Sequence, residues 1–282
     1  MISFMIYFYS YIVILMIITY FVNKIVIRYL SQLKRYEFIF FTIKTIVLIY
    51  MLTPLLAYVS NDYKKIFVNN ITKYIIKIFI ILYVIGFVYI GIDILRLYKK
   101  EQEISKLCIP CEDSFAIRTF ERVKESEHMK RCRIKLCQNE QVIIPQARGI
   151  LCPKIVLPYG RFYSYIGRDL EIILTHELNH HKYKDLLYRH LCHLIVILYW
   201  YDPAAYLLME EFIFWAEIRV DFATCENEIL QLDEGEYVSF LYKLINKCNP
   251  RIRLRRAYES GNLVERMKII VNRNKSEVKS IK

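Results

Sequence analysis

Two histidines and a glutamate in the segment His176-Glu177-Leu178-Asn179-His180 have the residue types and the spacing to do hydrolytic chemistry. On a helix, positions i and i+4 lie on one face, so His176 and His180 can bind the same metal ion. Glu177 lies between them and can take a proton from a water molecule at that ion. The segment therefore predicts a zinc hydrolase; the alternative is a surface helix with two solvated imidazoles.

A catalytic zinc ion needs a third protein ligand and one open position. Glu217 and Asp221 are four residues apart on a predicted helix that begins at Asp202 and Pro203, an N-cap acceptor followed by proline at the first helical position. The rest of that helix is apolar, so the two carboxylates are expected to point inward, where a metal site would satisfy them. Glu217 is the predicted third ligand, and Asp221 can hold a ligand histidine by its other ring nitrogen. The alternative is a solvated acidic face paired with Arg219.

The sequence offers three candidates for the residue that stabilises the oxyanion and does not rank them. These are Tyr206, Arg219 and His181. His181 directly follows the motif, but on an ideal helix its side chain points about 100° away from that of His180. A solvated position, or a contact to one of the ligands, is the preferred interpretation for His181.

The composition of the 282 residues points to a membrane protein. Hydrophobic residues make up 55% of the chain and its mean hydropathy is +0.24, yet its formal net charge is +12. Segregated apolar and basic residues explain both values, as in a protein whose basic loops face an anionic leaflet. The composition excludes a disordered chain. Nucleic-acid binding is the other interpretation of a basic chain, but no stripe dense in Lys and Arg supports it, so no direct nucleic-acid partner is expected.

Three apolar runs in the first hundred residues are long enough to cross a bilayer. They extend from about Ser3 to Val22, Phe38 to Val59 and Tyr74 to Leu95. The first run lacks the basic start and the small-residue cleavage site of a signal peptide, so it is expected to be retained. The basic residues after the third run favour an N-terminus outside the cell and a cytoplasmic C-terminal half. We thus expect a multi-pass protein of the cell membrane.

The second half predicts a small α+β domain. Residues 114–129 have the spacing of an amphipathic helix, and helical spacing returns from Asp169 onward. Between them, residues 132–137, 141–145 and 154–158 have the pattern of short strands, two of them ended by proline. The predicted organisation is a transmembrane region of three helices at 1–100, followed by a mainly helical zincin-type peptidase domain with a small sheet at 101–282.

A further apolar run, Leu186 to Leu208, could be taken for a fourth span. It contains Arg189, His190 and His193, and its uninterrupted apolar part is short. If it crossed the membrane, His180 and Glu217 would lie on opposite sides. We expect instead a helix that is buried under the zinc site or that grazes the membrane.

The sequence resembles the BlaR/MecR family of membrane zinc metallopeptidases. The resemblance rests on the three apolar runs, the segment Leu174 to Asp185, the Trp200-Tyr-Asp-Pro203 corner and Glu217-Ile-Arg-Val-Asp221. Cys152-Pro-Lys-Ile-Val-Leu-Pro158 and Asn262-Leu-Val-Glu-Arg266 also fit the pattern. Asp202 and Val220 stand where the family usually has Asn and Cys, and neither position bears the chemistry.

The resemblance implies a bacterial signal transducer with a cytoplasmic gluzincin site. The metal ligands map to His176, His180 and Glu217, and the catalytic base maps to Glu177. Antibiotic-sensing members respond to an extracellular β-lactam by initiating loss of a DNA-bound repressor, and they continue into a fourth span and an external penicillin-binding domain. This sequence stops at Lys282, so β-lactam sensing is not expected to carry over.

The expected activity is therefore that of a zinc metalloendopeptidase, with one catalytic zinc ion. Its expected partners are a protein substrate such as a transcriptional repressor, membrane lipid and a possible membrane sensor protein. Two alternatives stay open: a membrane quality-control gluzincin that degrades many proteins, and a non-catalytic sensor or scaffold that keeps zinc for structure.

The predicted orientation can be tested by labelling from outside intact cells. A cysteine introduced at Asn61 should react with a membrane-impermeant maleimide, and one at Gln102 should react only after permeabilisation, because the third run separates the two positions. Reaction at residue 102 in intact cells would contradict the cytoplasmic placement of the second half.

Overall fold

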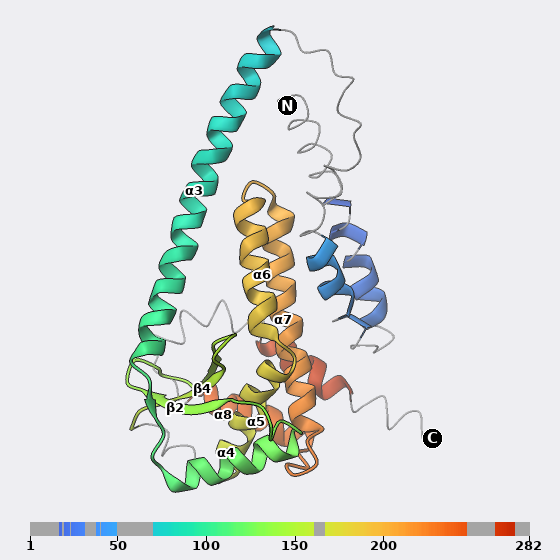
Figure 1. The fold of residues 1–282 in the computed structure, drawn as a ribbon. Coiled ribbons are helices and arrows are strands. Elements are labelled where there is room, and N and C mark those ends of the chain that lie inside the picture. The colour runs from blue at the N-terminus through green and yellow to red at the C-terminus, as the bar shows by residue number, and fades with distance from the viewer. Residues whose placement is uncertain are drawn as a thin grey trace. The chain divides into compact units, whose positions relative to one another are not determined.

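The structure is a computed structural model, drawn in Figure 1. It describes residues 17–18, 20–22, 24–31, 38–39, 41–49, 70–160, 167–246 and 263–273. Most of the first two predicted spans lies outside these ranges, and the described parts of both are helical. The chain divides into two compact units, the first comprising 1–101 with 187–213 and the second 102–186 with 214–282.

Helix α3 (Asn70–Lys106) contains the third predicted span. Its segment Ile81–Lys106 is the one helical stretch, among the residues that the structure describes, with the length and hydropathy to cross a membrane. Apolar side chains cover the exposed surface of its first part, up to Leu95, as expected where lipid replaces water. Ile85, for example, is 60% exposed. The presence of three membrane spans stays a prediction.

Two helices replace the single apolar run at 186–208. Helix α6 (Asp185–Leu198) ends before a turn at 199–202, and helix α7 (Pro203–Cys225) begins directly after it. The predicted start of α7 is confirmed, because the side chain of Asp202 accepts a hydrogen bond from the backbone N–H of Ala204 at 2.9 Å. The sequence did not predict that residues 187–213 group with the first unit.

The second unit contains a four-stranded sheet of order β1-β2-β4-β3. Its strands are β1 (Ile109–Pro110), β2 (Lys135–Asn139), β3 (Gln146–Arg148) and β4 (Lys154–Pro158). Strands β2 and β4 are parallel, and the other two pairs are antiparallel. The strand predicted at 154–158 is confirmed with the same bounds.

The other two predicted strands were shifted. The predicted strand 141–145 is a turn region, and β3 follows it. The side chain of Asn139 accepts the backbone N–H of Gln141 at 2.7 Å, which turns the chain, and Pro145 cannot donate to a ladder. The strand predicted at 132–137 forms at 135–139 instead, where β4 offers it a parallel partner.

Among the described residues, five helical segments complete the second unit. They are α4 (Ser114–Ser126), α5 (Arg168–Lys182), the second half of α7, α8 (Glu234–Asn246) and a final helix at 263–273. Helix α5 packs on α4 and on strands β3 and β4. Its residues Leu174 and Leu178 are fully buried, as are Ile155 and Leu157 of β4. The predicted helix 114–129 ends early, at Ser126, and His128 adopts a φ of 57° that stops it.

Candidate metal centre

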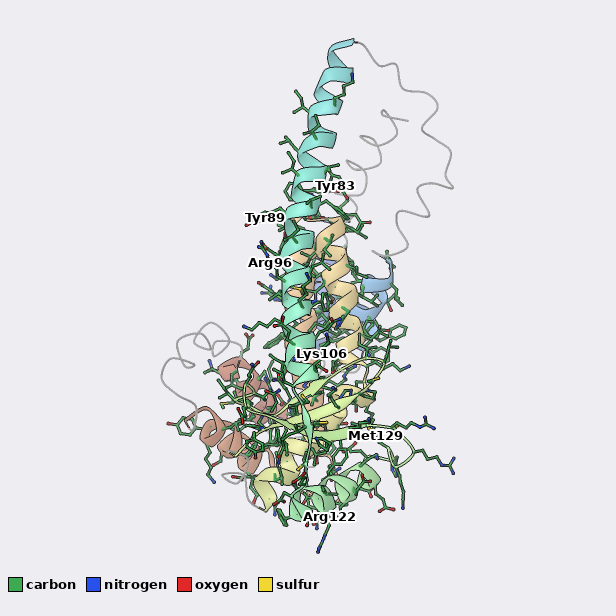
Figure 2. All side chains as sticks on the ribbon, turned by 60° about the vertical axis from the view of Figure 1, so that its left-hand side comes forward. Tyr83, Tyr89, Arg96, Lys106, Arg122 and Met129 are labelled. Carbon is green, nitrogen blue, oxygen red and sulfur yellow. The ribbon has the colours of Figure 1, made fainter. Side chains whose placement is uncertain are left out.

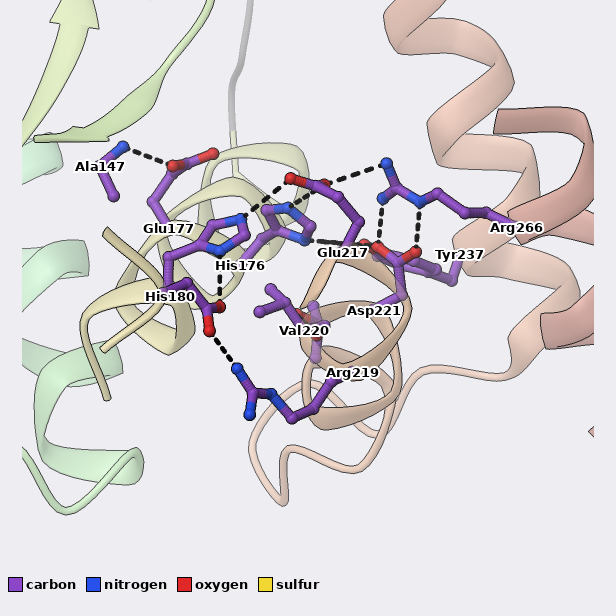
Figure 3. Close-up of polar contacts among 12 residues, drawn as sticks. Ala147, His176, Glu177, His180, Glu217, Arg219, Val220, Asp221, Tyr237 and Arg266 are labelled. Carbon is purple, nitrogen blue, oxygen red and sulfur yellow. Dashed lines mark hydrogen bonds and ion pairs between the residues drawn. The ribbon is translucent and has the colours of Figure 1, made fainter. Parts of the chain in front are cut away.

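Helices α5 and α7 bring three of the predicted residues together. One donor atom from each of His176, His180 and Glu217 lies within 4.8 Å of the other two. The Nε2 atoms of both imidazoles lie 3.6 Å from the Glu217 carboxylate, His176 from Oε2 and His180 from Oε1. Figure 3 shows the three side chains converging from the two helices. Two imidazole nitrogens and one carboxylate facing a common point are the donor set of a catalytic zinc site, so these residues fit the ion that the sequence implies.

Glu177 lies beside this group but points toward the sheet. Its Oε2 atom accepts a hydrogen bond from the backbone N–H of Ala147 in β3 at 2.6 Å. Burial raises the pKa of the Glu177 carboxyl, although the two imidazoles and the Ala147 N–H oppose that shift. A carboxylate held at the side of the donor set, rather than within it, suits proton transfer better than metal binding.

The charge of Glu217 is stabilised from several sides. Burial alone would raise the pKa of its carboxyl, but Arg266 and the two histidines hold it well below the usual range. The guanidinium of Arg266 lies 3.0 Å from Glu217 Oε2. Glu217 is therefore ionised in the protein, as a carboxylate ligand must be.

Asp185 orients His180, and the sequence analysis missed this role. Asp185 is 1% exposed, and its Oδ2 atom lies 3.0 Å from Nδ1 of His180. Arg219 donates to the other carboxylate oxygen and stacks on the ring of Tyr183, 4.2 Å from its centroid. Burial lowers the pKa of His180, but the carboxylates of Glu217 and Asp185 outweigh it and raise the pKa. Asp185 stands five residues after His180, a spacing that could have indicated it.

His176 has a different partner, Tyr237 of α8. The Tyr237 hydroxyl lies 3.1 Å from His176 Nδ1 and donates to Asp221 Oδ1 at 2.7 Å. The predicted contact between Asp221 and a ligand histidine is therefore mainly indirect, since Asp221 Oδ1 itself is 3.5 Å from His176 Nδ1. Tyr237 lies 61 positions from His176 in the sequence, and no local motif marks it.

Arg266, on the final helix, joins Asp221 to Glu217. Its Nε and one terminal nitrogen donate to Asp221 at 2.8 and 2.7 Å, while the other terminal nitrogen contacts Glu217. Asp221 is fully buried, so this bidentate pair offsets the cost of burying its charge. The sequence analysis noted Arg266 only as part of a family pattern.

The three candidates for the oxyanion donor all have other partners. His181 Nε2 lies 3.1 Å from the backbone carbonyl of Lys154, Arg219 binds Asp185, and the Tyr206 hydroxyl donates to the carbonyl of Trp200. Val220, where the family usually has cysteine, is fully buried and offers no donor atom to the site.

Comparisons with known proteins identify the family of the chain. The family model described as BlaR1 peptidase M56 matches residues 3–270, so the chain belongs to that family. The family is zinc-dependent in general, and membership supports a signalling protein of the membrane metallopeptidase type. Two kinds of curated relatives, BlaR1 and MecR1, are similar over shorter segments.

The regulatory protein BlaR1 of Bacillus licheniformis is 30% identical over 108 residues, which are 38% of this chain and 18% of that protein. The methicillin resistance mecR1 proteins of Staphylococcus aureus and Staphylococcus epidermidis are 27% identical over 97 residues, 29% of this chain and 16% of each relative. The matched segments thus span less than a fifth of these relatives.

Replacing Asp185 tests how His180 is oriented. Asp185→Asn should weaken zinc binding by about 10- to 100-fold, because a neutral amide supports the imidazole less well than a carboxylate does. A competition titration with a chelating dye measures the affinity. Glu140→Gln, which removes an exposed carboxylate from the same unit, is the matched control. Equal affinities in the two variants would show that Asp185 does not support the metal site.

Proposed function

We propose that this protein is an integral-membrane, zinc-dependent endopeptidase that cleaves a cytoplasmic regulator, such as a transcriptional repressor, in signal transduction. The observation that carries the proposal is the convergence of His176, His180 and Glu217 beside Glu177. Membership in the BlaR1 peptidase M56 family supports it. The proposed placement is a membrane region at 1–100, an N-terminus outside the cell and a cytoplasmic peptidase domain at 101–282.

His176, His180 and Glu217 would hold one zinc ion, with Asp221 supporting the ligands through Tyr237 and Arg266. When bound, zinc supplies Lewis acidity, which lowers the pKa of water and polarises a carbonyl group. Asp185 keeps the Nδ1 side of His180 occupied, so that its Nε2 faces the metal position. Tyr237 does the same for His176.

Glu177 is the proposed general base and acid. It would accept a proton from the attacking water and return it to the leaving amine. Its carboxylate is held by the Ala147 N–H on one oxygen, at 2.6 Å. A base fixed in this way needs no reorientation between the two proton transfers.

Strand β3 is the proposed binding edge for the substrate. Among the described strands, β3 pairs with β4 alone, which leaves its other edge without a strand neighbour. The Ala147 N–H at that edge points to Glu177, so the edge faces the proposed catalytic group. An extended peptide added there as a further strand would pass beside the donor set.

The metal content gives a first test of the proposed function. Protein purified in detergent should contain about one zinc ion per chain, since a single three-ligand site binds one ion. His180→Ala should lose most of the metal, and Glu177→Gln should retain it, because Glu177 is not in the donor set. Elemental analysis under reducing conditions measures both. A wild-type protein that stays metal-free after incubation with zinc would contradict the proposal.

Glu177→Gln then tests the chemistry. It should reduce proteolysis on the order of 10²- to 10⁴-fold, the contribution of a general base, while zinc content is unchanged. Two probes separate the alternatives: a purified winged-helix repressor, and casein. A single cut in the repressor supports the regulator-cleaving peptidase, whereas loose degradation of both favours quality control. Absence of cleavage by the zinc-loaded wild type would favour the scaffold.

A further inference from the structure

The turn between α6 and α7 contacts α3 in the middle of its apolar run. The indole N–H of Trp200 donates to the backbone carbonyl of Tyr83 at 3.2 Å. In return, the Tyr83 hydroxyl donates to the carbonyl of Leu198 at 3.0 Å, and its ring meets that of Tyr201 edge to face. Figure 2 shows Tyr83 on the side of α3 that faces α6, with Tyr89 on the opposite side. All of these residues belong to the first unit.

Gly86 makes this contact possible. A Cβ atom at position 86 would overlap the indole ring of Trp200, whereas one at Gly91 would meet nothing within 4 Å. The indole therefore lies directly on the backbone of α3. Small residues allow such close approach between helices in membranes.

The position of this contact along α3 fixes its depth if α3 crosses a bilayer. The apolar run extends from about Tyr74 to Leu95, so Tyr83 and Gly86 flank its midpoint. The hydrocarbon core is about 30 Å thick, which places its midplane about 15 Å from either surface. The turn at 199–202 would then lie near the middle of the hydrocarbon.

We propose that residues 187–213 form a re-entrant helical hairpin, which enters the bilayer from the Lys99 and Lys100 side of α3 and returns to that side. Its partner is the acyl-chain region of the lipid. The proposal needs α3 to cross a membrane. It does not depend on cleavage of any protein by the metal site.

The hairpin meets the requirements of backbone in hydrocarbon, where polar groups must be enclosed by protein or paired. The carbonyl of Leu198 accepts from Tyr83, and that of Trp200 accepts from the Tyr206 hydroxyl. The Asp202 carboxylate is 0% exposed and caps α7 through the Ala204 N–H. The protein thus encloses the polar groups of the turn, although the second carboxylate oxygen of Asp202 has no hydrogen-bond partner among the described residues.

The distribution of charge along both limbs agrees with this depth. Residues 194–201 on one limb and 203–209 on the other carry no charged side chain. Each stretch corresponds to roughly 10 Å of helix. Outward-facing leucines, Leu194 and Leu207, are 46% and 38% exposed. Glu210 is the first charged side chain after the uncharged stretch of the α7 limb, and it is near enough to the membrane surface to reach the headgroups.

Two contacts place the base of the hairpin at the cytoplasmic ends of the spans. The imidazole of His193 lies 3.3 Å from the hydroxyl of Tyr98, next to the basic pair that ends the third run. The Lys44 ammonium lies over the ring of Tyr188, 4.5 Å from its centroid. Lys44 stands close to the start of the second predicted span, which is its cytoplasmic end in the proposed orientation.

The two tryptophans allow the depth to be measured directly. The full chain is reconstituted in phosphatidylcholine vesicles brominated either deep in the acyl chain or near the headgroup. In Trp215→Phe, the remaining Trp200 should lose most of its fluorescence to deep bromines and little to aqueous iodide. In Trp200→Phe, deep bromines should not quench the fluorescence of the remaining Trp215. Trp215 is twelve residues along α7 from Pro203, which is about 18 Å of helix and more than the distance of about 15 Å from the midplane to the surface.

If Trp215→Phe does not fold, the emission of Trp200 is obtained by subtracting the emission of Trp200→Phe from that of the wild type. Its quenching by bromines and by iodide is then measured on this difference. Quenching of Trp200 by iodide, without quenching by deep bromines, would place the hairpin outside the bilayer and overturn the proposal.

Two alanine variants test the packing. Gly86→Ala should lower the melting temperature and reduce the quenching of Trp200 by deep bromines, because the methyl group displaces the indole. Gly91→Ala should leave the quenching unchanged and the melting temperature unchanged or higher, since alanine favours a helix. Identical behaviour of the two variants would show that the turn does not pack on α3, and would also overturn the proposal.

Discussion

The site depends on holding the carboxylate of Glu217 against two imidazoles from another helix. His176 and His180 are fixed to each other by their spacing on α5, but Glu217 comes from α7, and its charge is buried. Burying a carboxylate without compensation costs several kcal/mol. The protein compensates it with Arg266, whose guanidinium also binds the fully buried Asp221. The final helix is therefore part of the site, although it supplies none of the predicted ligands.

Each imidazole is held by a different arrangement. His180 is paired with the carboxylate of Asp185, which Arg219 neutralises. His176 instead contacts the hydroxyl of Tyr237, which donates a hydrogen bond to Asp221. These contacts leave both Nε2 atoms directed at Glu217. Orientation is thus set by residues that come from the start of α6, from α7 and from α8, so the donor set exists only when these helices are assembled.

Helix α7 has two roles, because one continuous helix carries both the cap residues of the hairpin turn and Glu217. Its first half belongs to the first unit and its second half to the second. If the hairpin enters the bilayer as proposed, α7 is a direct covalent connection between lipid-embedded residues and a proposed metal ligand.

Local spacing in the sequence was enough to predict the motif helix, the start of α7 at Asp202 and Pro203, strand β4 and the grouping of His176, His180 and Glu217. These features depend on helical periodicity and on capping chemistry, which neighbouring residues determine. The prediction of a strand at 141–145 was wrong, because pairing with β4 determines which residues form β3. The roles of Tyr237 and Arg266, and the grouping of residues 187–213 with the first unit, were decided by the tertiary structure. Tyr237 and Arg266 reach the site from segments 61 and 45 positions away, and the spacing of residues along one segment contains no information about such contacts.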